Sequence, residues 1–203
     1  MITIKNKKDI RFIKKLIRDY KFDKGKIEYL NKITGSPLNL ENYDYVTAYI
    51  LDNYPIRTGQ PQPSILDIGC FVGLFVDFLK KLGYSNVFGI DNSEAFVKAA
   101  KKIGINIKLG DARNLSNFFN ERSFDFVSCI QMIHNDYNKP LPEVNKFILD
   151  LFQEVKKVLK KKGIFFCNAY IPLPLKDINL MGFENMYSSF SDKTKNYIFK
   201  NTI

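Results

Sequence analysis

The sequence contains no tryptophan, a single histidine (His134) and only three cysteines, and no long apolar run occurs in it. Cys70, Cys129 and Cys167 lie far apart and form no C-x-x-C pair, which leaves few ligands for a zinc site. No segment approaches the length of a membrane-spanning helix, and the N-terminal end lacks the apolar stretch of a signal peptide. We therefore expect a soluble, cytoplasmic protein with reduced thiols, no structural metal and no membrane span.

The net charge of +10 is unevenly distributed along the 203 residues. Residues 1–40 hold 11 Lys and Arg against four Asp and Glu, whereas the rest holds 20 against 17. Residues 11–21 alternate basic and apolar side chains at a helical spacing, which predicts an amphipathic basic helix. Its basic face is either a docking surface for RNA, an acidic membrane surface or an anionic substrate, or a solvated face whose other side packs on the body. We favour the solvated face, and the sequence gives no indication of the oligomeric state.

The chain length allows one hydrophobic core and leaves no room for a second full domain. After the basic helix, Gly35 to Pro37 break the chain, and residues 41–54 read as a second helix that must stop before Pro55. The segment 57–63 contains two prolines and a glycine, which predicts a loop. We therefore expect an N-terminal helical cap at 1–60 and a main domain at 61–203.

From residue 64 onward, short apolar runs alternate with helical patterns, as is typical of βαβ units that build a parallel sheet. The expected strands are 64–68, 86–90, 106–109, 124–130 and 163–169. A helix from Leu74 ends at Gly83, and a second one, capped by Ser93, ends at Gly104. A third helix carries apolar residues from Val144 to Leu159 and a basic last turn from Lys160 to Lys162. This order predicts an α/β fold with a doubly wound, mostly parallel, Rossmann-like sheet.

The segment from Ile65 to Leu74 joins a buried strand to a helix through a turn that contains Gly69 and Gly73. These glycines allow a tight turn and the close approach of a ligand to the backbone. Asp67 places a negative charge beside the turn, which repels a dinucleotide pyrophosphate and attracts a cationic ligand. A nicotinamide dehydrogenase, which needs G-x-G-x-x-G here, is therefore disfavoured.

This strand and turn resemble motif I, D-x-G-x-G-x-G, of the class I methyltransferases that depend on S-adenosylmethionine (AdoMet). Asp91 ends the second strand where that family binds the ribose hydroxyls, and Asp111 lies where it binds the adenine amino group. The resemblance covers about residues 64–170 and implies the class I fold, AdoMet as cofactor and methyl transfer as activity. The cofactor-binding residues that it implies are Asp67, Gly69, Cys70, Phe71, Gly73, Asp91, Asn92, Asp111, Ala112, Ile130 and Gln131.

The middle glycine of motif I is replaced by Phe71. Its benzyl group either swings away from the cofactor or packs against it, and in the wrong rotamer it blocks the methionine arm. This departure keeps a second hypothesis open, in which the chain is a catalytically silent AdoMet-fold module that binds a partner protein or RNA.

His134 follows the fourth expected strand, close to the predicted position of the transferred methyl group. It is the candidate general base, since its ordinary pKa lies near neutrality, and Asp136 and Tyr137 are weaker candidates. Methyl transfer is an in-line displacement that positioning alone accelerates, so a base is not required. We expect the acceptor to be an oxygen or nitrogen atom of a small molecule or sugar.

An RNA substrate is the alternative acceptor. The spacing from Ser128 and Cys129 to His134 resembles messenger RNA cap guanine-N7 methyltransferases, although Val72 replaces the lysine of their motif I. No N-P-P-Y or D-P-P-Y sequence follows the fourth strand, which argues against methylation of DNA-base or glutamine amino groups.

After Tyr170 only 33 residues remain, where the family completes its sheet with two antiparallel strands. The segment 195–203 supplies one strand, and the second comes from around 179–186 or is missing, which gives a shortened edge. Tyr170, Phe183, Tyr187 and Phe190 line a substrate lid or pack under a loop, and we favour packing.

Overall fold

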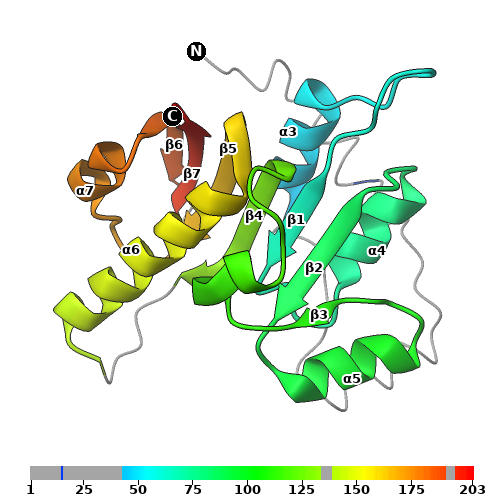
Figure 1. Ribbon diagram of the computed structural model, residues 1–203, viewed down its shortest axis with the longest axis horizontal. Coiled ribbons are helices and arrows are strands. Elements are labelled where there is room, and N and C mark those ends of the chain that lie inside the picture. Colours follow the sequence, from blue (N-terminus) through cyan, green and yellow to red (C-terminus); the bar gives the residue numbers. More distant parts are fainter. Residues whose placement is uncertain (1–14, 16–42, 134–138, 191–194) are drawn as a thin grey trace.

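The computed structural model describes residues 15, 43–133, 139–190 and 195–203, which form a seven-stranded sheet (Figure 1). The strand order is β3-β2-β1-β4-β5-β7-β6. Strands β1 to β5 pair in parallel, and β7 pairs antiparallel with both β5 and β6. This confirms the predicted doubly wound sheet. The strands are β1 (Ile65–Ile68), β2 (Val87–Asp91), β3 (Lys108–Leu109), β4 (Phe124–Ile133), β5 (Leu159–Ala169), β6 (Phe183–Phe190) and β7 (Lys195–Asn201).

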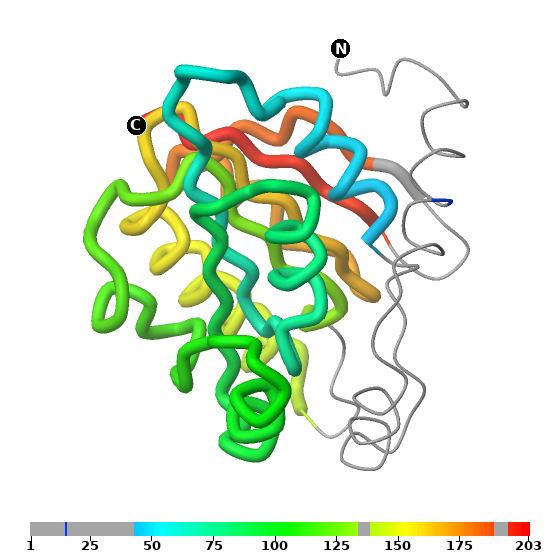
Figure 2. Tube along the Cα trace, turned by 90° about the vertical axis from the view of Figure 1, so that its right-hand side faces the viewer, coloured from blue at the N-terminus to red at the C-terminus, as the bar shows by residue number. Residues whose placement is uncertain are grey.

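Helices cover both faces of the sheet, as the two views in Figures 1 and 2 show. Neighbouring residues of one strand enter opposite cores, because side chains alternate between the faces: Ile65 packs with α3, α4 and α5, and Leu66 with η2, α6 and α7. The helices are α3 (Asp44–Asn53), α4 (Leu74–Lys81), α5 (Glu94–Lys102), the 3-10 helix η2 (Ala112–Asn117), α6 (Leu141–Val158) and α7 (Leu175–Leu180).

The helix boundaries follow local signals in one case and tertiary pairing in another. Ser93 caps α5 as predicted, since its Oγ accepts the N–H of Phe96 at 3.4 Å. The predicted helical turn from Lys160 to Lys162 is wrong, because α6 ends at Val158 and β5 begins at Leu159. Leu159 pairs with Phe124 of β4, and these contacts with the sheet draw the segment out of the helix.

The C-terminal edge contains both antiparallel strands. Strand β7 pairs with β5 from Ala169↔Lys195 to Ile164↔Lys200, and β6 pairs along β7. The second edge strand, which the sequence analysis gave as present or missing, is therefore present. Phe183 is 2% exposed and packs against Phe152 and Phe199, so it belongs to the core and not to a lid.

Helix α3 confirms the helix that was predicted at 41–54. The predicted basic helix at 11–21 and most of the N-terminal cap lie outside the described residues. Within the described part of the chain, no helix has both the length and the apolar character that a membrane crossing requires.

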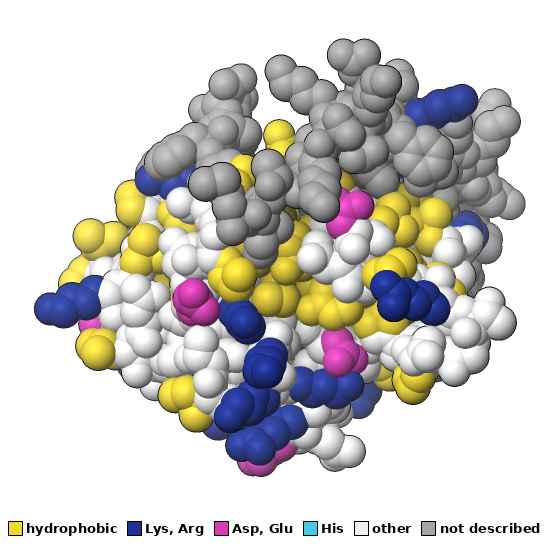
Figure 3. Space-filling model, turned by 90° about the horizontal axis from the view of Figure 1, so that it is seen from above, with side chains coloured by type: hydrophobic (Ala, Val, Ile, Leu, Met, Phe, Trp, Pro, Cys, Tyr) yellow, Lys and Arg dark blue, Asp and Glu magenta, His cyan; other side chains and the backbone are white. Residues whose placement is uncertain are grey.

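Figure 3 shows Lys and Arg side chains gathered on one side of the face that is seen from above. The end of α6 and the start of β5 hold five lysines within residues 156–162.

Candidate functional site

The order of the strands predicts a ligand-binding crevice at the carboxyl ends of the parallel strands. The chain passes from β1 outward to β2 and β3 and then returns to β4 on the other side of β1. In such sheets, ligands bind beyond the carboxyl ends of the strands, where the order reverses. Asp67 lies near the end of β1, Asp91 ends β2, and Asp111 follows β3 by two residues. Because these strands are parallel, the structure brings the three predicted carboxylates to the same edge.

The side chain of Asp67 is 1% exposed and lies beside Ser128, its register partner on β4. The Ser128 hydroxyl donates a hydrogen bond of 2.7 Å to Oδ1 of Asp67. The other carboxyl oxygen, Oδ2, is buried and has no hydrogen-bond partner in the described part of the chain. Burial raises the pKa of Asp67 to about 7, against the opposing effect of the Ser128 hydrogen bond. A cationic group placed beside Oδ2 would satisfy this oxygen and favour the ionised form.

Three residues of the turn after β1 take left-handed backbone conformations. Gly69, Phe71 and Gly73 have φ angles of 64°, 57° and 73°. Phe71 therefore adopts the conformation that glycine adopts without a steric penalty. Its ring lies 4.2 Å, centroid to centroid, from that of Phe96 on α5 in an edge-on arrangement. The ring is thus held against α5.

Asp91 ties the turn to the end of β2. Its Oδ2 accepts the N–H of Phe71 at 2.8 Å, and its Oδ1 accepts the N–H of Ser93 at 2.9 Å. Burial is the largest influence and raises the pKa of Asp91, while the two backbone hydrogen bonds act in the opposite direction. Each carboxylate oxygen has two lone pairs, so these contacts leave one acceptor position on each oxygen. This spare capacity suits a pair of neighbouring hydroxyl groups.

Asp111 makes its contacts with the start of η2, where it is the N-terminal cap. It accepts the backbone N–H of Arg113 at 2.8 Å and forms an ion pair with the guanidinium group of the same residue. The Arg113 hydrogen bonds lower the pKa of Asp111. The side chain of Asp111 is 29% exposed, in contrast to the two buried acids, and Ala112 next to it is 9% exposed.

The carboxyl end of β4 carries a second strained residue. Gln131 has a φ angle of 59°, and its N–H donates a hydrogen bond of 2.6 Å to the side-chain oxygen of buried Asn168 on β5. Its amide nitrogen donates a hydrogen bond of 3.0 Å to the hydroxyl of Tyr170. The strained backbone and these contacts hold the exposed side chain of Gln131 beside Tyr170, which directly follows β5.

The side chains of Met132 and Tyr43 also reach the turn after β1. A Cβ atom added to Gly69 would lie 2.8 Å from Sδ of Met132, so this methionine packs directly on the glycine. Tyr43 stacks on Phe75, with ring centroids 4.4 Å apart. Burial first, and then the charge of Asp67, raise the pKa of the Tyr43 phenol, which places it close to that carboxyl group.

The remaining predicted site residues lie around the same turn. The side chains of Cys70 and Ile130 are buried in the core beneath α4, so their backbones alone face the crevice. Asn92 is exposed after β2. His134, Asp136 and Tyr137 lie outside the described residues.

Sequence reasoning assigned no role at this edge to several side chains that the structure brings there from other strands, helices and turns. They are Tyr43, Phe96, Arg113, Ser128, Met132 and Asn168. Ser128 acts through Asp67, its register partner on β1. Asn168 acts on Gln131 within a register irregularity between β4 and β5. Neither contact has a spacing signal in the sequence. Among the described residues, no cluster of three or more His, Cys, Asp or Glu side chains could hold a metal ion.

The sequence of this site matches a known protein family. A model of the family described as methyltransferase domain matches residues 66–167, which is half of the chain. No curated protein matches the sequence. The matched segment begins in β1 and ends in β5, so it contains the described turn and all three carboxylates.

Several solved structures have a similar fold. PH0226 protein from Pyrococcus horikoshii OT3 has a TM-score of 0.59 and 19% identity, over 80% of this chain and 89% of that chain. A ribosomal protein L11 methylase from Lactobacillus delbrueckii subsp. bulgaricus has a TM-score of 0.60 and 16% identity, over 82% and 81%. A SAM-dependent methyltransferase from Aquifex aeolicus has a TM-score of 0.56 and 20% identity, over 90% and 100%. At these identities, the likeness concerns the fold.

Proposed function

This chain belongs to the methyltransferase domain family, and from that premise we propose that it transfers a methyl group from AdoMet to an oxygen or nitrogen atom of a small molecule or sugar. Its family and class I fold make it an AdoMet-dependent methyltransferase. The proposal rests above all on Asp67, whose buried Oδ2 has no partner among the described residues and suits a cationic ligand. The α-amino group of AdoMet is such a cation.

The three carboxylates divide the recognition of AdoMet between them. Asp67, with the backbone of the turn from Gly69 through Cys70 and Phe71 to Gly73, holds the methionine end. The remaining acceptor positions of Asp91 bind the ribose hydroxyls, and Asn92 lies beside them. Asp111 accepts the adenine amino group, and the N–H of Ala112 contacts the ring. Ile130 and Gln131 pass the cofactor at the end of β4.

AdoMet, when bound, would supply a methyl group on a sulfonium: the acceptor's lone pair would form the new bond to the methyl carbon, the carbon–sulfur bond would break in line with it, and sulfur would keep that electron pair. The residues contribute mainly by orientation, since holding two reactants in line removes much of the barrier. The exposed Gln131–Tyr170 pair orients the acceptor at the ends of β4 and β5. His134 takes the acceptor proton, and residues 1–60 close over the substrate as a cap on the domain at 61–203.

A small acceptor agrees with the position of one cluster of lysines that the structure describes. The lysines at 156–162 lie at the end of α6 and the start of β5, whereas the three carboxylates lie near the carboxyl ends of β1 to β3. Phosphates bound to these lysines would sit at the edge of the sheet opposite the site. RNA remains the alternative acceptor through the N-terminal basic segment at 11–21.

Isothermal titration calorimetry of the full chain with AdoMet and with its demethylated product tests the proposal. We expect both to bind, and we expect His134→Ala to leave binding intact while it lowers turnover on an acceptor panel of sugars and small hydroxy and amino compounds. If neither ligand gives heat of binding, the proposed methyl transfer is overturned and the catalytically silent binding module is favoured. Phe71 in motif I is the specific observation in favour of that module. If the protein methylates RNA and none of the small compounds, the proposal of a small-molecule or sugar acceptor is overturned.

A further inference from the structure

Arg113 folds back on Asp111, two residues before it, and holds both oxygens of that carboxylate. The Nε–H is shared between Oδ1 at 3.0 Å and Oδ2 at 3.1 Å, and Nη2 donates to Oδ2 at 2.5 Å. The backbone N–H of Arg113 donates to Oδ1 at 2.8 Å. One residue therefore supplies three N–H groups to a single carboxylate, and the planar guanidinium fixes the plane of that carboxylate.

This arrangement leaves Asp111 limited capacity for a further contact. A carboxylate has about four lone-pair positions, and three N–H groups fill about three of them. The side chain of Asp111 is 29% exposed, so the remaining position is accessible from solvent. A ligand that meets this position has to bring a hydrogen-bond donor, because the carboxylate has no proton to give.

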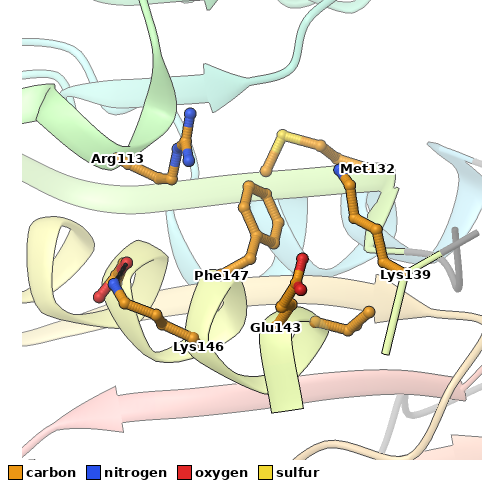
Figure 4. A pocket seen from close by; sticks show the side chains of 8 residues that line it. Arg113, Met132, Lys139, Glu143, Lys146 and Phe147 are labelled. Carbon is orange, nitrogen blue, oxygen red and sulfur yellow. Dashed lines mark hydrogen bonds and ion pairs between the residues drawn. The ribbon is translucent and has the colours of Figure 1, made fainter. Parts of the chain in front are cut away.

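The guanidinium group is itself held from α6. It lies 5.8 Å from the centroid of the Phe147 ring, a distance at which a cation is attracted to the face of an aromatic ring. Arg113, Met132 and Phe147 line a cavity of about 430 Å³. Figure 4 shows these side chains around the cavity. Lys146 lines the same cavity, but it pairs with Asp150 at 2.7 Å. Met132 connects this cavity to the turn after β1, since it packs on Gly69.

From this geometry we propose that Arg113 is a positioning residue, which keeps the Asp111 carboxylate oriented as a pure acceptor and so selects a base with an exocyclic amino group. The inference rests on the proposed function, in which Asp111 meets the base of AdoMet. Adenine brings an amino N–H to the remaining lone pair and binds. Hypoxanthine brings a carbonyl oxygen to the same place and is repelled.

The charge of Asp111 supports this selection. The hydrogen bonds from Arg113 lower the pKa of Asp111, so the carboxylate presents a negative charge to the base. The same hydrogen bonds prevent this carboxylate from rotating away from a carbonyl oxygen. Removal of the guanidinium leaves the carboxylate ionised but free to rotate, which weakens adenine binding and lessens the rejection of hypoxanthine, whereas a purely structural role would weaken both ligands equally.

Calorimetry with S-adenosylhomocysteine and S-inosylhomocysteine on the full chain tests this inference. We expect the wild type to prefer the adenosyl ligand by about tenfold to about a hundredfold, which is the range for hydrogen bonds to charged groups. Arg113→Met, which keeps the length of the side chain, should reduce this preference to about threefold or less. Arg113→Lys, which keeps the charge without the planar fork, should give an intermediate preference. Lys146→Met is the matched control and should retain the wild-type preference.

The outcomes separate the two proposals. An Arg113→Met protein that keeps the full preference, or that weakens both ligands by the same factor, overturns the role of Arg113 while AdoMet binding stands. If Arg113→Met does not fold, as judged by circular dichroism, the ligand preference of Arg113→Lys decides by the same criterion. If the wild type binds neither ligand, the proposed function fails, and this inference fails with it.

Discussion

The hydroxyl of Ser128 donates a hydrogen bond of 2.7 Å to Oδ1 of Asp67 across the β1–β4 pairing, and Oδ2 of the same carboxyl is left without a partner in the described part of the chain. The two residues are register partners, so the parallel alignment of the strands brings them together. Burial of this half-satisfied carboxyl raises its pKa to about 7. A cationic ligand is therefore linked to the proton equilibrium of Asp67.

We predict that AdoMet affinity rises with pH through about 7. The ligand cation favours the ionised form of Asp67, whose pKa is raised to about 7 without ligand. Below that pH a carboxylate has to lose a proton before it pairs with the cation, which weakens binding by up to about tenfold per pH unit. Calorimetry with AdoMet from about pH 5.5 to about pH 8.5 measures this slope.

Asp67→Asn is the control for this pH dependence, because it keeps the shape and removes the titrating group. The affinity of this variant for AdoMet should be lower than that of the wild type and should not change with pH over the same range. A slope that survives in this variant would assign the titration to another residue.

The stability of the ligand-free wild-type protein should change with pH in the opposite direction to the affinity. A raised pKa stabilises the fold fully below the ordinary value of 3.8, and this contribution is lost as the pH rises through about 7.

Asp91→Ala should lower AdoMet affinity by about 1–3 kcal/mol through the loss of charged hydrogen bonds. The same change removes the acceptor for the N–H of Phe71, so the unfolding midpoint in urea should also fall. Glu94→Ala is the matched control, since Glu94 is an exposed acid three residues along the chain that pairs with Lys98. Unchanged affinity in a folded Asp91→Ala protein would refute the ribose assignment.

At position 71, we predict that alanine destabilises the protein more than glycine does. Phe71→Gly relieves the left-handed conformation at φ 57° and loses the contact with Phe96, so the two effects partly cancel. Phe71→Ala loses the same contact and keeps the strain, which costs about 1–2 kcal/mol. Urea unfolding of the two variants measures the difference. A tenfold gain in AdoMet affinity with glycine would instead mean that the ring obstructs the site.

Asn168→Leu should destabilise the fold by about 1–3 kcal/mol, because it leaves the strained Gln131 N–H without its acceptor. Tyr170→Phe removes the hydrogen bond from the exposed Gln131 side chain, and it should change stability by less than about 0.5 kcal/mol. Equal unfolding free energies for the two variants would show that Asn168 does not support the end of β4.

Some parts of the site followed from local sequence, and others did not. The short apolar runs and the punctuating glycines predicted the parallel strands, and the resemblance to the methyltransferase motifs implied the positions of Asp67, Asp91 and Asp111. The end of α6 was misjudged, because helical periodicity continues to Leu159 while pairing with Phe124 draws that residue into β5. The contact of Arg113 with Asp111 was not predicted, because an arginine in a turn has no spacing signal in the sequence.

The sequence by itself determined the order of the elements and the chemical type of the groups at one edge of the sheet, since hydrophobic period and turn residues are local properties. Only the tertiary structure decided that Ser128 faces Asp67, that Asn168 holds Gln131 and that Met132 packs on Gly69. These contacts depend on strand register and on the path of loops through space. Register is selected by the burial of whole faces at once, a global condition that no single segment contains.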